Sequence, residues 1–181
     1  NGPDIKKIKF KISKFDNIKN LENKIGKLAE KACNKIGKQI LEKKLITFNQ
    51  QTRQINYLRK RNLTDIIINL KMNYSSINLL VNSFSKPYTG SIIIIGDKIL
   101  RVSKISKIKN RNINSIEIGK LLKINKNYVI TRCQDALVKI YFYSPFNPRK
   151  NKISYIYDPL YYILKSKKLF KDIINLLNRN N

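Results

Sequence analysis

The sequence has 181 residues, and its 38 Lys and Arg against 11 Asp and Glu give a formal net charge of +27. It contains no His, which excludes an imidazole base, a Ser-His-Asp triad and a histidine metal site. Its two cysteines are too few for a four-cysteine zinc site. A charge this high favours a polyanionic partner, and we expect that partner to be a nucleic acid.

Residues 1–62 are predicted to form a basic N-terminal arm followed by a long amphipathic helix. The arm, residues 1–15, alternates basic and apolar residues, which suits a segment lying along phosphates or a terminus without fixed structure. Over residues 16–46 apolar residues recur every three or four positions, which predicts a helix with Asp16 as its N-cap. Its lysines lie largely off the apolar stripe, so the helix either contacts nucleic acid or exposes a solvated lysine face.

Two further helices are predicted on either side of a central β-rich part. Residues 63–87 are interpreted as a packing helix over 63–82 and a linker; this helix carries almost no charge, so we expect it to pack rather than to bind. Residues 154–181 hold a C-terminal amphipathic helix, with Asp158 as its N-cap and Pro159 at its first position.

Residues 88–153 are predicted to form a β-rich, RNA-binding module. Short apolar runs rich in β-branched residues predict strands, and the loops between them are basic. Gly96-Asp97 is a turn signal, and Asp97 is expected to form that turn rather than to act in catalysis. Five short strands in this stretch favour a small barrel or sandwich. The runs are residues 92–95, 99–102, 113–118, 128–131 and 136–143.

The sequence offers little catalytic chemistry. It lacks the glycine spacing of a phosphate-binding loop, and its carboxylates are never three or four positions apart. Cys133, next to Arg132, is interpreted as a lone buried thiol rather than a nucleophile of lowered pKa. A Ser-Lys dyad has no fixed spacing and stays open. Clustered tyrosines stack on bases or fill strands and cores; they are Tyr141, Tyr143, Tyr155, Tyr157, Tyr161 and Tyr162.

Several stretches between residues 88 and 153 share their order and spacing with a known family. They are Ile92–Ile95, residues 96–102 (Gly-Asp-Lys-Ile-Leu-Arg-Val), residues 116–122, residues 137–140 and residues 149–152 (Arg-Lys-Asn-Lys). This pattern resembles the large-subunit ribosomal protein twenty-one family of bacterial and organellar ribosomes. The His-containing tail of that family is missing here. The resemblance implies a small barrel whose loops grip large-subunit rRNA, with no catalysis.

We therefore predict an α+β protein with a small β-barrel-like module, flanked by basic N-terminal helices and a C-terminal helix. Its predicted function is that of a structural, non-enzymatic constituent of a mitochondrial or other organellar large ribosomal subunit. The expected partners are ribosomal RNA and neighbouring ribosomal proteins, with no small-molecule substrate, cofactor, metal or transmembrane segment. The predicted RNA contacts are Arg59, Lys60, Arg61, Lys104, Lys107, Arg111, Arg149, Lys150 and Lys152.

Other function classes fit the same charge. A DNA-binding or nucleoid-type protein would use the helix over 16–46 to dimerise or to lie on duplex. A basic amphipathic-helix protein would bind acidic proteins or an anionic membrane surface. An enzyme acting on nucleic acid would depend on the few carboxylates. No apolar run approaches the roughly 20 residues of a spanning helix. The chain opens with Asn-Gly-Pro-Asp rather than Met, so we expect a processed or partial form.

Overall fold

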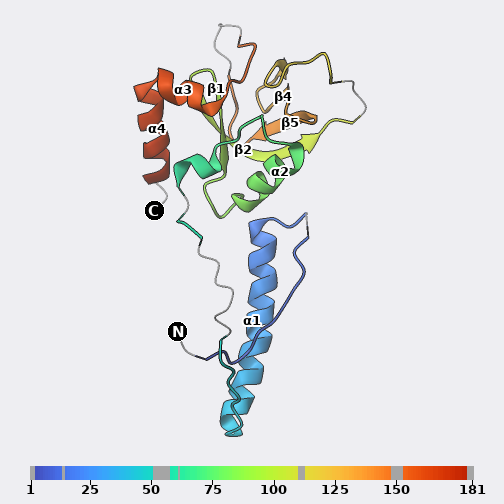
Figure 1. Cartoon of the computed structure of the whole chain (residues 1–181), viewed down its shortest axis with the longest axis vertical. Coiled ribbons are helices and arrows are strands. Elements are labelled where there is room, and N and C mark those ends of the chain that lie inside the picture. The colour runs from blue at the N-terminus through green and yellow to red at the C-terminus, as the bar shows by residue number, and fades with distance from the viewer. Residues whose placement is uncertain are drawn as a thin grey trace. The chain divides into compact units, whose positions relative to one another are not determined.

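The computed structural model of the chain describes residues 3–13, 15–50, 58–60, 62–109, 113–147 and 153–178. The chain divides into two compact units, Asn1–Lys60 and Arg61–Asn181. The first unit contains one long helix, and the second contains an antiparallel sheet and the other helices (Figure 1). The predicted α+β class is confirmed.

Helix α1, Ile18–Leu41, dominates the first unit. Its N-cap is Asn17, whose side chain accepts the N–H of Asn20 at 2.9 Å, so the predicted cap at Asp16 is one residue too early. The Asp16 carboxylate instead accepts the N–H of Ser13 and pairs with Lys24. No residue of α1 is buried. Its apolar stripe therefore has no enclosed core within this unit.

In the second unit, the helix predicted over 63–82 is two shorter elements. A 3-10 turn, η1, spans Leu63–Ile66, and helix α2 spans Tyr74–Ser83. Between them the backbone is extended, and Ile68 donates its N–H to the carbonyl of Ile92 at 2.8 Å. This contact with the sheet ends the helical path, and Asn73 begins α2 as its N-cap.

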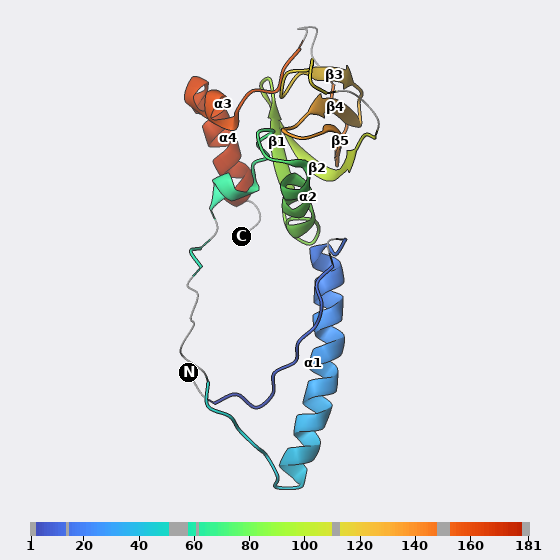
Figure 2. The same cartoon turned by 45° about the vertical axis from the view of Figure 1, so that its right-hand side comes forward.

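The sheet has five antiparallel strands in the order β1-β2-β5-β4-β3 (Figure 2). The strand predicted over 113–118 is wrong: its residues form turns, and the strand lies a few positions later. Gly96 and Asp97 form the turn between the first two strands, with Gly96 at φ +62°. The strands are β1 Ser91–Ile95, β2 Lys98–Lys107, β3 Leu121–Ile124, β4 Tyr128–Arg132 and β5 Leu137–Phe142.

Backbone segments cover both edges of the sheet. Ile67 makes a parallel bridge to Ile92 beside β1, and Lys120 makes an antiparallel bridge to Tyr155 beside β3. At the second edge Gly119 has φ +87°, and a Cβ there would lie 2.3 Å from the Ile156 carbonyl oxygen. Glycine is therefore required for this close approach. The five strands thus form an open sheet whose two edge strands, β1 and β3, are each covered by another segment of the chain.

Strand β1 is buried on both faces, which explains its four consecutive isoleucines. Ile93 and Ile95 enter the main core with the inner residues of β2, β4 and β5 and with α2. Ile92 and Ile94 enter a second cluster with Tyr162 and the η1 turn.

The predicted C-terminal helix divides into α3, Pro159–Lys165, and α4, Lys167–Asn178. The expected start is confirmed, because the Asp158 side chain accepts the Leu160 N–H at 3.0 Å and Pro159 is the first helical residue. Ser166 adopts an extended conformation and separates the two helices. None of the described helices has the length and apolar content needed to cross a bilayer.

Candidate functional site

The outer face of the sheet carries basic and aromatic side chains over β2, β5 and β4. Because side chains alternate along a strand, burial of Val138, Ile140 and Phe142 in the core places Lys139 and Tyr141 on the opposite face. Cross-strand pairing places Tyr141 between Lys104 and Tyr128. It likewise places Lys139 between Ser106 and Ile130. We call this set the outer-face strip; its members are Lys104, Ser106, Tyr128, Ile130, Lys139 and Tyr141.

Lys139 lies at the centre of the outer-face strip. Its Nζ atom is 3.9 Å from the centroid of the Tyr128 ring and 4.9 Å from that of Tyr141. The two rings are tilted by 52° with their centroids 5.9 Å apart. A hydrogen bond with Lys139, helped by Ser106 and the nearby ammonium charges, lowers the pKa of Tyr141. The arrangement thus holds positive charge over an aromatic surface.

No carboxylate opposes this charge within the sheet. The five strands contain Lys and Arg residues but no Asp or Glu. Lys123 on β3 pairs with Ile130, so its position continues the outer-face strip onto a fourth strand. A surface with several ammonium groups and no compensating carboxylate attracts phosphates.

The structure separates the predicted contact residues. Lys104 lies in the outer-face strip, opposite Tyr141. Lys107 is exposed at the end of β2 on the other face, near Asp135. The pKa of the Asp135 carboxyl is lowered mainly by the Tyr74 N–H, which it accepts at 2.7 Å, and to a smaller degree by Lys107. Arg59 and Lys60 belong to the first unit. Five predicted contacts lie outside the described residues: Arg61, Arg111, Arg149, Lys150 and Lys152.

The tyrosine cluster predicted from sequence divides into separate groups. Tyr141 belongs to the outer-face strip, and Tyr143 lies under Lys86. The other four form what we call the tyrosine group. Within it the Tyr157 ring centroid is 6.1 Å from that of Tyr155, 4.8 Å from Tyr161 and 6.0 Å from Tyr162.

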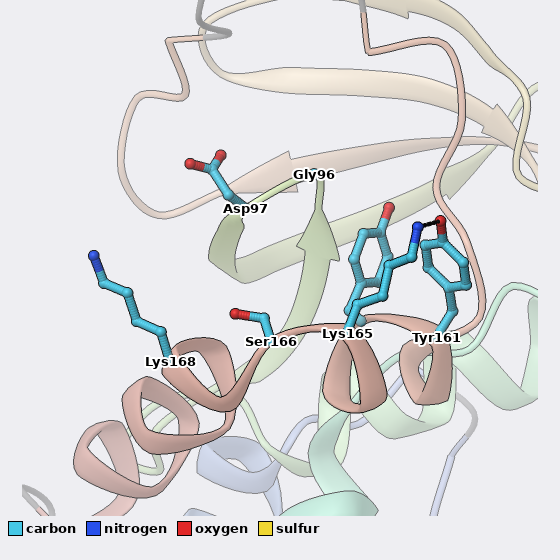
Figure 3. Close-up of a pocket in the computed structure, with 7 residues that line it drawn as sticks. Gly96, Asp97, Tyr161, Lys165, Ser166 and Lys168 are labelled. Carbon is cyan, nitrogen blue, oxygen red and sulfur yellow. Dashed lines mark hydrogen bonds between the residues drawn. The ribbon is translucent and has the colours of Figure 1, made fainter.

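A cavity of about 280 Å³ lies between the β1–β2 turn and the junction of α3 and α4. Lys165 and Tyr161 meet at one side of it, with 2.6 Å between Nζ and the phenol oxygen (Figure 3). This hydrogen bond raises the pKa of Lys165. Lys168, in the first turn of α4, also lines the cavity, and its side chain points away from Lys165 and Tyr161 (Figure 3). The lining residues are Gly96, Asp97, Tyr161, Tyr162, Lys165, Ser166 and Lys168.

A second cavity, of about 340 Å³, shares Tyr161 with the first. Tyr155, Tyr157 and Ile118 give it aromatic and aliphatic walls. Its polar edge is Asp158, which pairs with Lys71 at 3.1 Å and accepts an N–H of the Asn69 side chain at 3.3 Å.

The side chains of Cys133 and Arg132 stabilise the fold of the sheet unit rather than form part of a site. Cys133 is buried and unpaired, as predicted, and burial raises the pKa of its thiol. Arg132 donates to the carbonyls of Ile113 and Ile116 and thereby holds that turn. Within the described part of the chain, no three His, Cys, Asp or Glu residues gather in a way that would hold a metal ion.

Lys139, Tyr141 and Tyr128 were not predicted as one site. The alternation that puts Val138, Ile140 and Phe142 in the core also places Lys139 and Tyr141 outside, so this signal is in the sequence. Their proximity to Lys104 and Tyr128 depends on the order β2-β5-β4, which is not a local property of the sequence.

A protein-family model for the C-terminal domain of formyl transferases matches residues 62–153, just over half of the chain. No curated protein matches the chain. The matched segment includes all five strands of the sheet and therefore the whole outer-face strip.

This match overturns the predicted ribosomal identity. The resemblance to the ribosomal protein twenty-one family over 88–153 is wrong, because the same residues fit a different family. A Gly-Asp turn between apolar runs serves many antiparallel sheets and does not distinguish families. The predicted non-enzymatic role in a large ribosomal subunit, with rRNA and ribosomal proteins as partners, is also wrong. The expected lack of a small-molecule substrate is contradicted as well, because the match is to a domain of formyl transferases. The DNA-binding and membrane-surface alternatives gain no support.

Proposed function

Since the chain belongs to the formyl transferase C-terminal domain family, we propose that it takes part in formyl transfer and holds a phosphate-rich acceptor. The acceptor class that fits is a nucleic acid carrying a primary amine. The outer-face strip binds its phosphates, and a small molecule donates the formyl group. The predicted organellar location stays a prediction.

One observation carries this proposal: Lys104 and Lys139 flank Tyr141 on a sheet face whose strands have no carboxylate. Each lysine neutralises a phosphate as a point charge, and the tyrosines give the flexible lysine stems a rigid support. Phosphate contacts of this kind position a substrate without reading its sequence. The role assigned to the described residues is therefore binding and orientation of the acceptor.

The reaction itself defines what must be brought together. The acceptor amine attacks the formyl carbon of the donor, so that a new carbon–nitrogen bond forms while the bond between the formyl group and the donor breaks. The amine gives up one proton, which ends on the released donor. Holding the acceptor beside the donor lowers the entropic part of this barrier.

The proposal is tested in cells that lack the protein and are complemented with variants. Mass spectrometry measures the formylated fraction of amine-bearing RNA. We expect the wild type to restore it and the Lys104→Ala/Lys139→Ala double variant to restore much less. The matched control is Lys27→Ala/Lys31→Ala, which removes the same charge from the exposed surface of α1. Full restoration by the outer-face variant at equal protein level would overturn the assignment of this face. A formylated fraction that does not depend on the protein would overturn formyl transfer.

A further inference from the structure

The two cavities beside the tyrosine group are separated by one side chain. Tyr161 lines both, and its phenol oxygen bonds Lys165 on one side while its ring contacts Tyr157 on the other. We call the cavity lined by Lys165 and Lys168 the basic cavity. We call the other, lined by Tyr155 and Tyr157 with Lys71 at its edge, the aromatic cavity. We propose that together they form a nucleotide site, with the base in the aromatic cavity and the phosphate in the basic cavity.

The aromatic cavity has the features that a planar base needs. The Tyr157 side chain is 51% exposed, although Tyr155, Tyr161 and Tyr162 surround it. These neighbours fix the Tyr157 ring, so a base stacking on it costs little side-chain entropy. Ile118, also exposed, supplies an apolar wall. The Asp158 carboxylate and the Asn69 amide line the same cavity and are hydrogen-bonded to each other, with Lys71 paired to the carboxylate. Each carboxylate oxygen has a second lone pair, with which it can accept a hydrogen bond from the edge of a base.

The basic cavity has the features that a phosphate needs. Lys165 is held at one wall by its 2.6 Å hydrogen bond to Tyr161 (Figure 3). Lys168 of α4 also lines the cavity. Asp97 also lines this cavity, so two ammonium groups face one carboxylate. The net charge therefore favours an anion. Tyr161 lines both cavities, so the proposal places the ring of one ligand in the aromatic cavity and its phosphate in the basic cavity.

This inference rests on the proposed function in one respect, since the nucleotide is taken to be an unpaired residue of the phosphate-rich acceptor. A free nucleotide has the same chemistry. The outer-face strip would bind the phosphates of the paired part, and the tyrosine group would hold one unpaired nucleotide. The outer-face strip would then fix the position of the acceptor's backbone, and the tyrosine group would fix the position of one unpaired nucleotide.

The test uses the full chain with ring-labelled tyrosine, and NMR follows the ring signals during titration with adenosine monophosphate. We expect the Tyr157 and Tyr161 signals to move, and Tyr157→Ala to weaken binding by roughly five- to thirtyfold. Tyr157→Phe keeps the ring and should keep binding. Tyr143→Ala removes an exposed tyrosine outside the cavities and is the matched control. Lys168→Met should weaken binding of the monophosphate but not of adenosine.

A second arm identifies the source of the nucleotide. Hairpin RNA with a single-stranded overhang is compared with the blunt hairpin; tighter binding of the overhang that Tyr157→Ala removes supports an acceptor residue. Equal binding of both hairpins, with the monophosphate still bound, restricts the site to free nucleotides and overturns the acceptor assignment. If the monophosphate leaves the Tyr157 and Tyr161 signals unchanged, the nucleotide site is wrong. Failure of the outer-face strip is recognised separately, because Lys104→Ala/Lys139→Ala should weaken hairpin binding while the monophosphate still shifts the Tyr157 and Tyr161 signals as in the wild type.

Discussion

The two units of the chain use apolar residues in opposite ways. In α1 a regular apolar stripe leaves every residue at least partly exposed, and Ile25 is 51% exposed. In the sheet unit, all five residues of strand β1 are buried. Both sequences carry a regular set of apolar residues. The difference teaches that periodicity predicts an element, whereas only the presence of partner elements decides whether its apolar face becomes a core.

The basic residues of the two units differ in whether carboxylates accompany them and in whether strand pairing fixes their positions. In the first unit they accompany a helix without buried residues, and α1 itself contains acidic Glu22 and Glu30. In the sheet unit, Lys104 and Lys139 are fixed by strand pairing on a face without carboxylates. A fixed group of like charges marks a binding surface better than a high average charge does.

The largest contrast is expected from truncating one isoleucine in each unit. Ile93→Ala leaves a cavity at a position with no exposed surface, and should cost about 4 kcal/mol of unfolding free energy. Ile25→Ala should cost less than about 1 kcal/mol, because the side chain is half exposed and Ala favours helix. Peptide-resolved hydrogen exchange measures both. Equal losses of protection would contradict the comparison.

The two units should also respond differently to replacing glycine by alanine. Gly119→Ala places a Cβ against the Ile156 carbonyl oxygen and should destabilise the sheet unit by about 3 kcal/mol. Gly37→Ala meets nothing within 4 Å and should stabilise α1 by about 1 kcal/mol. Urea unfolding followed by circular dichroism distinguishes them. A stable Gly119→Ala protein would show that the edge can open without cost.

The end of α1 offers a smaller test. Lys43 has φ +55°, and the N–H groups of Lys43 and Lys44 donate to the carbonyls of Ile40 and Gln39. This is the hydrogen-bond pattern of a Schellman ending, which favours glycine at Lys43. Lys43→Gly should stabilise the helix by about 1 kcal/mol. Lys38→Gly, inside the same helix, is the control and should destabilise it; thermal unfolding monitored by helical circular dichroism reads both.

The smallest expected effect concerns pH and the α3 cap. The Leu160 N–H, followed by Lys71 and Asn69, lowers the pKa of Asp158 below its unfolded value. Its contribution is therefore present above the unfolded pKa of about 3.9 and is lost as pH falls through the lower folded value. Asp158→Asn keeps the capping oxygen and should cost about 0.5 kcal/mol at neutral pH. Its melting temperature should fall less than that of the wild type between neutral pH and pH 2. If the melting temperatures of the two proteins fell equally with pH, the contribution of the Asp158 carboxylate to stability would be refuted.

Local signals in the sequence predicted much of the fold. Asp158-Pro159 marked the start of α3, Gly96-Asp97 marked the first hairpin, and the isoleucine run marked β1. The failures lie where a tertiary contact overrides a local pattern. The apolar residues between 63 and 73 have helical spacing, yet the helical path stops after the 3-10 turn, because Ile67 is extended and pairs with Ile92.

The candidate site was predictable only in part. The net charge indicated a polyanion. Lys104 was predicted as an RNA contact in a basic loop, whereas the structure places it within β2; its contact with RNA stays a prediction. Its neighbours Lys139 and Tyr128 come from strands that are distant in sequence, and only their register brings them together. The enzyme family could not be inferred from charge, because positive charge indicates what is bound and not which reaction follows.

The most direct test of the outer-face strip is the affinity of the full chain for an amine-bearing RNA, measured by fluorescence anisotropy over a range of salt concentrations. Wild type and Lys104→Ala/Lys139→Ala are compared, with Lys27→Ala/Lys31→Ala as the charge-matched control. We predict that the outer-face variant binds at least about tenfold more weakly and that its log–log salt slope is smaller by about 1.5 to 2, whereas the control changes little. Equal affinity and slope for the outer-face variant and the control would contradict the assignment of this face to the acceptor.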